Sequence, residues 1–182
     1  GFIGSNFIHY ILANNPAISI VNLDSLTYAG NPDNLINLPD KNRYKFIQGN
    51  ICDQKLVKKL MQSYQIDTIV HFAAESHVDR SIEGPNVFVK TNIEGTAVLL
   101  DQARLFWQEN MNWTDKDCRF HQVSTDEVYG SLRNDSPAFT ESTAYDPSSP
   151  YSASKAAADH IVRSYFRTFD LPITISCCSN NY

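Results

Sequence analysis

The chain has 182 residues, of which 42% are hydrophobic and 19% are charged, a composition typical of a globular domain and not of a disordered or fibrous chain. Its net charge of −5 and its lack of any basic run argue against a nucleic-acid-binding surface. Since no apolar stretch reaches the roughly 20 residues of a membrane span and no secretory signal is recognisable, we expect a cytoplasmic protein.

Hydrophobic periodicity predicts helices and strands that alternate along the chain. The predicted helices are residues 7–12, 54–64, about 86–108 and about 152–168, and the predicted strands are residues 18–23, 44–48, 68–72, 119–123 and 173–177. This alternation indicates an α/β fold, a doubly wound parallel Rossmann sheet with helices on both faces. Such a fold begins with a buried strand that leads into its first glycine, and no strand precedes Gly1. We therefore expect residues 1–182 to be a partial NAD-binding domain whose first strand is missing.

Two glycines stand where the first helix is expected to begin. Gly1 would let the backbone approach a pyrophosphate, Gly4 would let the helix pack closely on the sheet, and the helix N-terminus would attract the phosphates. Phe2 and Ile3 would add backbone contacts. Two glycines at this spacing are equally compatible with an ordinary turn at the start of a helix.

An acidic residue, Asp24, ends an apolar strand 20 residues after Gly4. A carboxylate at this point accepts hydrogen bonds from the ribose hydroxyls of a dinucleotide. Its charge would repel a phosphate on that ribose, so the sequence favours NAD over NADP. The alternative is that Asp24 is only a turn residue.

Small or short side chains follow the next predicted strands. Ala73 and Ala74 follow Phe72 at the end of the predicted strand 68–72 and are small, as a backbone that runs beneath a cofactor requires, and Thr91 would face the cofactor from the long helix. Small residues are also common in tight loops, and a helical threonine often bonds only to the backbone.

Cysteine and histidine spacing adds two negative expectations. The four cysteines form no C-x-x-C pair, and the five histidines show no metal-ligand spacing. We expect reduced thiols and no metal site.

Five residues in the last third of the chain predict chemistry. Tyr151 and Lys155, four apart on a helix, share a face, so the ammonium can lower the pKa of the phenol and make it a base. Asp126 and Glu127 supply an acid and a second base beside the hydroxyl of Thr125. Each feature has a structural alternative. Tyr151 and Lys155 could lie on an exposed helix face, Asp126 and Glu127 could form a solvated acidic turn, and Thr125 could cap the end of a strand. Their combined order, behind a buried strand and ahead of a helix, favours catalysis.

These motifs together resemble a known family. The residues that carry the resemblance are Gly1-Phe2-Ile3-Gly4, Phe72-Ala73-Ala74-Glu75-Ser76, Thr125-Asp126-Glu127 and Tyr151-Ser152-Ala153-Ser154-Lys155. They resemble the extended short-chain dehydrogenase/reductase superfamily and, within it, the dTDP-glucose 4,6-dehydratase family. The resemblance implies oxidation of dTDP-glucose at carbon 4 by NAD, loss of water across carbons 5 and 6, and return of the hydride to carbon 6.

The resemblance also implies a role for each catalytic residue. Tyr151 removes the proton of the 4-hydroxyl, Lys155 stabilises the phenolate and binds the nicotinamide ribose, and Thr125 positions the 4-oxygen. Glu127 removes the proton of carbon 5, while Asp126 protonates the departing 6-hydroxyl. Further cofactor contacts are implied for Ser25, Leu26, Thr27, Asn50, Ile51, Glu75, Ser76 and Asn181, and substrate contacts for Ser76, Thr125 and Asn180.

Three positions depart from the family pattern. Relatives carry lysine at Ser25, aspartate at Asn50 and asparagine at Cys177. The family pattern also has a further glycine before Gly1 and a substrate-binding region after Tyr182, so we expect a fragment that is inactive alone.

Family members commonly form homodimers through the two long helices, and we expect the same here. Val98, Leu99, Ile161 and Phe166 face either the sheet or a partner, and for each of them we adopt burial in the core.

Other functions remain open. A UDP-glucuronate decarboxylase, a GDP-mannose dehydratase, an epimerase and a non-catalytic NAD-binding protein share parts of the pattern. Asp126 favours the dTDP-glucose dehydratase over the related enzymes, which often carry serine at this position.

Overall fold

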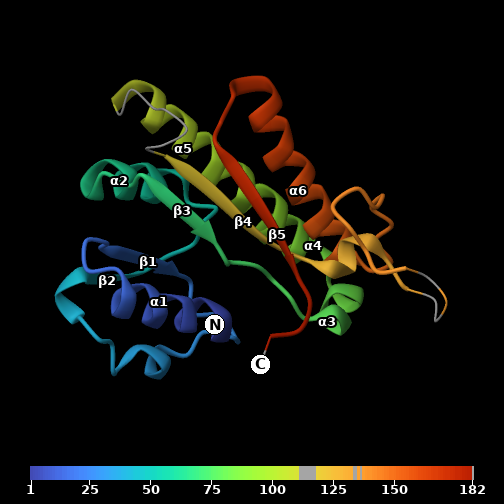
Figure 1. Ribbon diagram of the computed structural model, residues 1–182, viewed down its shortest axis with the longest axis horizontal. Coiled ribbons are helices and arrows are strands. Elements are labelled where there is room, and N and C mark those ends of the chain that lie inside the picture. Colours follow the sequence, from blue (N-terminus) through green and yellow to red (C-terminus); the bar gives the residue numbers. More distant parts are fainter. Residues whose placement is uncertain (111–117, 133–134, 136, 182) are drawn as a thin grey trace.

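Parallel strands in two sheets form the frame of the molecule (Figure 1). One sheet pairs β1 (Ile20–Asp24) with β2 (Tyr44–Gln48), and in the other β4 (Arg119–Thr125) lies between β3 (Thr68–His71) and β5 (Ile173–Cys178). The computed structural model describes residues 1–110, 118–132, 135 and 137–181.

Helical segments connect these strands. They are α1 (Phe2–Asn14), η1 (Pro32–Leu35), η2 (Lys41–Arg43), α2 (Gln54–Tyr64), α3 (Val78–Glu83), α4 (Pro85–Phe88), η3 (Val89–Glu94), α5 (Gly95–Asn110), η4 (Asp126–Tyr129) and α6 (Pro150–Phe169). Every predicted helix and strand is confirmed, with ends that differ by a few residues. The predicted long helix is continuous from α4 to α5 but contains one π-helical turn, η3. None of the helices that the structure describes combines the length and apolar character needed for a bilayer span.

Helix α6 is delimited by its own sequence. The Ser149 hydroxyl accepts a hydrogen bond from the Ser152 N–H at 3.0 Å, and the Ser152 hydroxyl accepts one from the Ser149 N–H at 2.9 Å. Pro150 occupies the first turn, where its missing N–H costs nothing. At the other end Asp170 takes a left-handed conformation, with φ of 53°. These caps fix Tyr151 in the first turn of the helix.

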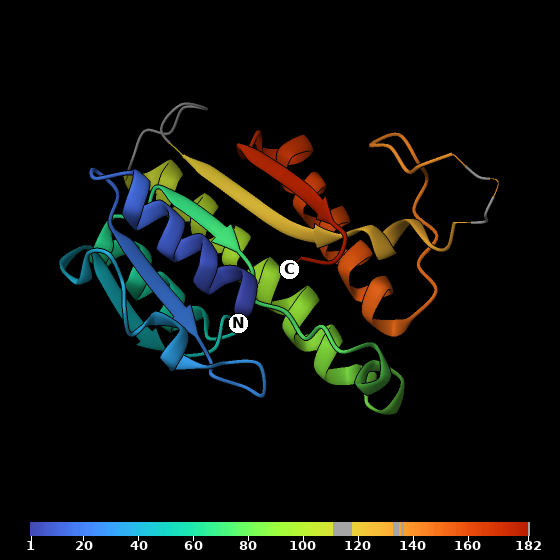
Figure 2. The ribbon, with the colours of Figure 1, turned by 60° about the horizontal axis from the view of Figure 1, so that its bottom comes forward.

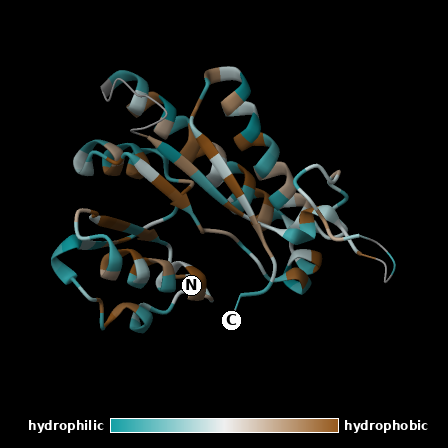
Figure 3. Cartoon of the chain, in the orientation of Figure 1, coloured by the Kyte–Doolittle hydropathy of each residue, from teal (hydrophilic) through white to brown (hydrophobic). Residues whose placement is uncertain are grey.

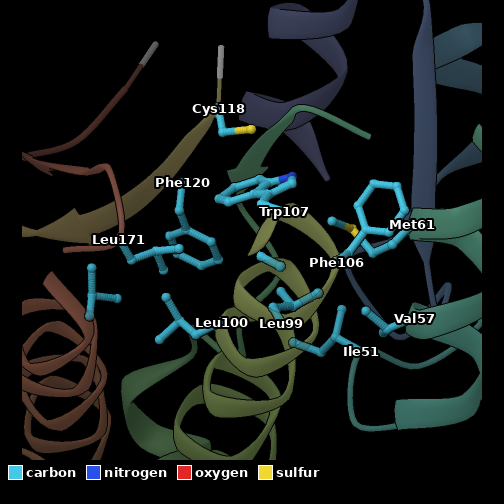
Figure 4. Packing of buried hydrophobic residues seen from close by; sticks show 12 residues of the cluster. Ile51, Val57, Met61, Leu99, Leu100, Phe106, Trp107, Cys118, Phe120 and Leu171 are labelled. Carbon is cyan, nitrogen blue, oxygen red and sulfur yellow. The ribbon is translucent and has the colours of Figure 1, made fainter. Parts of the chain in front are cut away.

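The two faces of β3–β5 are covered differently. Phe120 of β4 points into the main core with Leu100 and Trp107 of α5 and Val162 of α6 (Figure 4), each fully buried. The alternate residue His121 points to the opposite face, towards α1. Figure 2 shows α1 and the α5–α6 pair on opposite sides of these strands, and Figure 3 shows apolar and polar residues mixed along both the strands and the helices. The doubly wound arrangement is confirmed.

Two expectations need correction. The strands do not form one sheet, because β1 and β3 are not paired with each other. Phe166 is 52% exposed, so its predicted burial is wrong, because it lies on the face of α6 turned away from the sheet. Leu99 is buried, and Val98 and Ile161 pack against the core as expected.

Candidate active site

The carboxyl end of β4 meets the first turns of α6. Thr125 ends β4, and its hydroxyl is close enough to the phenol of Tyr151 on α6 to influence the pKa of that phenol. The Thr125 hydroxyl also accepts a hydrogen bond from the Glu127 N–H at 3.3 Å and so caps the short helix η4. The strand-end cap is therefore confirmed, and the same hydroxyl lies near the phenol, as the catalytic interpretation requires. The fold brings Thr125, Asp126 and Glu127 to the same end of the sheet as Tyr151.

Tyr151 and Lys155 are buried and do not lie on an exposed helix surface. Tyr151 is 8% exposed and Lys155 is 4% exposed, and the Tyr151 ring packs edge-on against Phe88 at 6.4 Å between centroids. A lysine is rarely buried without a specific partner. The Lys155 Nζ donates a hydrogen bond to the Val123 carbonyl oxygen at 2.8 Å. The exposed-face alternative is wrong.

The pKa of Tyr151 is raised, whereas the sequence analysis predicts that it is lowered. Burial raises it to about 12, against a hydrogen bond to Thr125 that lowers it, and the charges of Glu127 and Asp126 raise it further. Lys155 does not offset this, because its ammonium is directed to the backbone of β4 and burial lowers its own pKa. The expected lowering of the phenol pKa by Lys155 is wrong for this geometry.

The adjacent carboxylates differ in their surroundings. Burial, followed by the charge of Asp126, raises the pKa of Glu127. Asp126 accepts from the Thr125 hydroxyl at 3.4 Å. A carboxylate whose pKa is raised towards neutrality is a better base for a weakly acidic C–H, which fits the role predicted for Glu127.

The cofactor residues predicted near the N-terminus meet at one place. The Gly1 nitrogen lies 3.7 Å from Asp24 Oδ2, so the start of α1 and the end of β1 are adjacent. No side chain caps the first turn of α1, whose N–H groups are thus available to a phosphate. A Cβ on Gly1 would meet only the Ala29 carbonyl oxygen at 3.7 Å, and one on Gly4 would meet Phe72 at 3.6 Å. Neither glycine is forced by packing within the chain.

Several other predicted cofactor residues lie in exposed turns. The Leu26 N–H donates to Asp24 Oδ1 at 2.8 Å, with Leu26 itself at φ of 54°, and Ser25 and Thr27 beside it are exposed. Asn50 is exposed and its side chain accepts from the Cys52 N–H at 2.9 Å. The other predicted members, Ile51, Phe72, Ala73, Ala74 and Thr91, are buried or partly buried.

A buried asparagine that the sequence analysis missed positions the loop after β3. The Asn92 side chain accepts from the Glu75 N–H at 2.8 Å and donates to the Glu75 carbonyl at 2.9 Å. It also donates to the Ser154 hydroxyl of α6 at 2.8 Å. Asn92 lies in the π-helical turn η3, and such turns are frequent at functional sites. A polar residue on the apolar side of a predicted helix was the available signal.

Tyr28 is a second missed residue. Its hydroxyl lies 3.5 Å from the Ser76 hydroxyl, and the guanidinium of Arg80 lies 4.3 Å above its ring. Tyr28 thereby joins the loop after β1, predicted to hold cofactor, to the loop after β3, predicted to hold substrate.

A hollow of about 450 Å³ lies between α1 and β3–β5. It brings together predicted cofactor residues from distant parts of the chain, namely Phe2, Ile3, Phe72 and Asn181. The five predicted catalytic residues do not line it. Asn181 donates to the Ser179 carbonyl at 2.9 Å, and its neighbour Asn180 is exposed.

Comparisons with known proteins show the family to which the chain belongs. The family profile described as GDP-mannose 4,6 dehydratase matches residues 1–182. The dTDP-glucose 4,6-dehydratases of Shigella flexneri and Neisseria gonorrhoeae are 50% and 51% identical, each over 100% of the chain and 52% of that protein. The chain thus spans about half the length of the curated relatives it matches.

Solved structures show the same likeness. The dTDP-glucose 4,6-dehydratase DesIV of Streptomyces venezuelae, solved with NAD bound, is 46% identical, with a TM-score of 0.89 over 100% of this chain and 54% of that one. A UDP-glucuronic acid 4-epimerase of Bacillus cereus with NAD is 29% identical, with a TM-score of 0.82 over 96% of this chain and 52% of that one.

Proposed function

Because the chain belongs to the GDP-mannose 4,6 dehydratase family, we propose that it carries the catalytic and NAD-binding residues of a dTDP-glucose 4,6-dehydratase. The observation that carries the proposal is the meeting of a redox pair with an acid/base pair. Thr125, Asp126 and Glu127 stand at the end of β4, where Thr125 contacts the phenol of Tyr151 on α6. An epimerase needs the threonine and tyrosine but not the two carboxylates.

The residues at the start of α1 fit NAD. The uncapped helix N-terminus offers N–H groups to a pyrophosphate, Gly1 leaves space beside them, and Asp24 offers a carboxylate to a ribose. When bound, NAD accepts a hydride from carbon 4 of the sugar and later returns it to carbon 6.

The chain's residues supply the proton transfers. Tyr151 takes the proton of the 4-hydroxyl as carbon 4 becomes a ketone. The Thr125 hydroxyl forms a hydrogen bond with the 4-oxygen of the sugar. With a pKa of about 12 Tyr151 holds its own proton at neutral pH, and positive charge beside the phenol is what would release it. Lys155, on the same helix, would supply that charge only by turning from the Val123 carbonyl, where this structure directs it, towards the phenol.

The ketone acidifies the C–H of carbon 5, and Glu127 removes that proton. Asp126 donates a proton to the 6-hydroxyl, which leaves as water. After the hydride reaches carbon 6, Glu127 returns its proton to carbon 5, and Tyr151 and Asp126 exchange protons with solvent to reset the site. The net change is loss of one water from the sugar.

The test uses the protein at its full natural length, with NAD⁺ and each of dTDP-glucose, UDP-glucose, GDP-mannose and UDP-glucuronate. We expect NMR to show a dTDP-4-keto-6-deoxy sugar from dTDP-glucose alone. In Glu127→Gln we expect reduction of NAD⁺ without loss of water. Turnover of a different nucleotide sugar would replace dTDP-glucose as the proposed substrate. No reaction with any of the four sugars would favour a protein that only binds NAD.

Assembly and location belong to the same proposal. A homodimer through the long helices is supported by Phe166, which exposes an apolar ring on α6. Light scattering that shows only monomers would contradict it. Cytoplasmic location agrees with the free cysteines among the described residues and is checked by cell fractionation.

A further inference from the structure

A buried carboxylate that the proposed chemistry does not use lies beside the active site. Asp159 is on α6, four residues after Lys155, and is 0% exposed. The Ser124 hydroxyl donates to Asp159 Oδ2 at 2.5 Å, and the Tyr145 hydroxyl donates to the same oxygen at 3.1 Å. The other oxygen, Oδ1, has no hydrogen-bond partner among the described residues.

Both hydroxyls donate to Asp159, which is the pattern of an ionised carboxylate. Burial raises the pKa of Asp159, against the hydrogen bond from Ser124, the charge of Lys155, the hydrogen bond from Tyr145 and the charge of Arg163, all of which lower it. A buried carboxylate with an unpaired oxygen stabilises a fold poorly compared with an apolar side chain. Packing alone therefore does not account for Asp159.

Lys155 is the group that Asp159 affects most directly. Burial lowers the pKa of Lys155, and the charge of Asp159 is the largest influence that raises it, followed by Cys177 and Cys178 of β5. His71 of β3 is the other titratable group that senses the charge of Lys155, and its own pKa is lowered to about 3, so it is neutral. Among the groups around Lys155, Asp159 is thus the anion whose charge most favours the protonated form of the buried ammonium.

Asp159 also ties two elements together. Ser124, its partner at 2.5 Å, immediately precedes Thr125 on β4, whereas Asp159 and Tyr151 lie on α6. The hydrogen bond therefore holds the end of β4 against α6, about two helical turns from Tyr151. A misplacement of about 1 Å between such groups can cost about 100-fold in rate.

We propose that Asp159 is a positioning residue of this site, which holds Lys155 as an ammonium and holds Ser124, and so Thr125, against α6. The inference rests on the proposed function, since it names what keeps the same tyrosine, threonine and lysine in place.

The first experiment compares Asp159→Asn with wild type at full natural length, by following formation of the dTDP-4-keto-6-deoxy sugar from dTDP-glucose against pH. We expect a rate about 10- to 100-fold lower at neutral pH. We also expect the alkaline limb of the profile, where Lys155 loses its proton, to move to lower pH. Tyr145→Phe removes one hydrogen bond from the same oxygen but keeps the charge, so its alkaline limb should stay in place. Ser124→Ala should lower the rate without moving that limb.

The second experiment does not depend on turnover. In protein labelled with ¹³C-lysine, the Lys155 resonance, assigned by its loss in Lys155→Met, should titrate at lower pH in Asp159→Asn than in wild type or Tyr145→Phe. An unchanged Lys155 titration in Asp159→Asn would overturn the proposal that the charge of Asp159 keeps Lys155 protonated. A wild-type rate in Ser124→Ala would overturn the proposal that the Ser124–Asp159 hydrogen bond positions Thr125, even if Asp159→Asn does not fold. If wild type turns over no nucleotide sugar while the Lys155 titration moves as expected, the proposed function fails and the role of Asp159 towards Lys155 stands.

Discussion

The two ends of the site are built differently. At the end of β4, side chains are buried and bonded to one another, as in the contacts of Thr125 with Tyr151 and of Ser124 with Asp159. At the start of α1, the predicted cofactor residues are glycines, uncapped N–H groups and exposed turns, and the Asp24 carboxylate accepts from the Leu26 N–H of its own loop and lies near the Gly1 nitrogen. The chemical half is fixed by the chain itself, whereas the cofactor half presents groups that a ligand would have to satisfy.

The largest effect should come from the chemical half. Tyr151→Phe removes the proton acceptor of the oxidation step, so we expect NAD⁺ reduction by dTDP-glucose to fall about 1000-fold, with NAD affinity little changed. Tyr165→Phe, on the same helix but distant from β4's carboxyl end, is the control and should keep its rate. Comparable rates in both variants would remove Tyr151 from the chemistry.

Stability should also differ between the halves. Phe120→Ala opens a cavity beneath β4 in the main core and should lower the free energy of unfolding by about 3–5 kcal/mol. Phe46→Ala, on β2 of the cofactor half, removes a ring that is 37% exposed and should cost about 1 kcal/mol. Urea titration measures both, and equal losses would show that the two sheets are equally packed.

Acid should weaken the chemical half through His71. Burial, followed by the charge of Lys155, lowers the pKa of His71 to about 3 from an ordinary 6.5. The unfolded chain therefore binds the proton more readily, and stability is lost as pH falls from 6.5 towards 3. The loss should be about 2 kcal/mol at pH 5.

Denaturation at a series of pH values tests this dependence. His71→Gln should abolish that part of the acid sensitivity, and His77→Gln, at an exposed position, should not. A His71→Gln variant as acid-sensitive as wild type would contradict the assignment.

The smallest effect should come from the cofactor half. Asp24→Asn keeps an acceptor for the Leu26 N–H but removes the charge beside the ribose, so NAD affinity should fall about 10-fold and discrimination against NADP should weaken. Calorimetry with each cofactor measures both changes. Asp33→Asn, in the nearby turn η1, serves as the control, and an equal loss there would make Asp24 an ordinary turn residue.

Local patterns predicted the elements well because they depend on neighbours in sequence. The Ser149–Ser152 capping box and the periodicity of α6 specify that helix, and β2 and α2 have the predicted ends. The same patterns could not predict the π-helical turn around Asn92. The Asn92 side chain in this turn is hydrogen-bonded to the backbone of Glu75, 17 residues earlier in the chain. Such long-range hydrogen bonds leave no local periodic signal.

The site shows the same division. The residue types and order of Thr125, Asp126, Glu127, Tyr151 and Lys155 predicted a redox pair beside an acid/base pair, and the fold places their elements together. Tyr28 and Asp159 were missed because each acts through a contact made only in the folded chain. Asp159 did carry one local signal, its spacing of four residues from Lys155.

By itself the sequence determined the alternating helices and strands, the parallel α/β fold and the chemical identity of the groups at the site. Tertiary structure alone decided their electrostatic state. A pKa depends on burial and on charges brought from other elements, so Tyr151 is raised to about 12, whereas spacing along one helix predicted the opposite. The orientation of Lys155 towards Val123 was likewise decided by packing against β4, which no helical pattern contains.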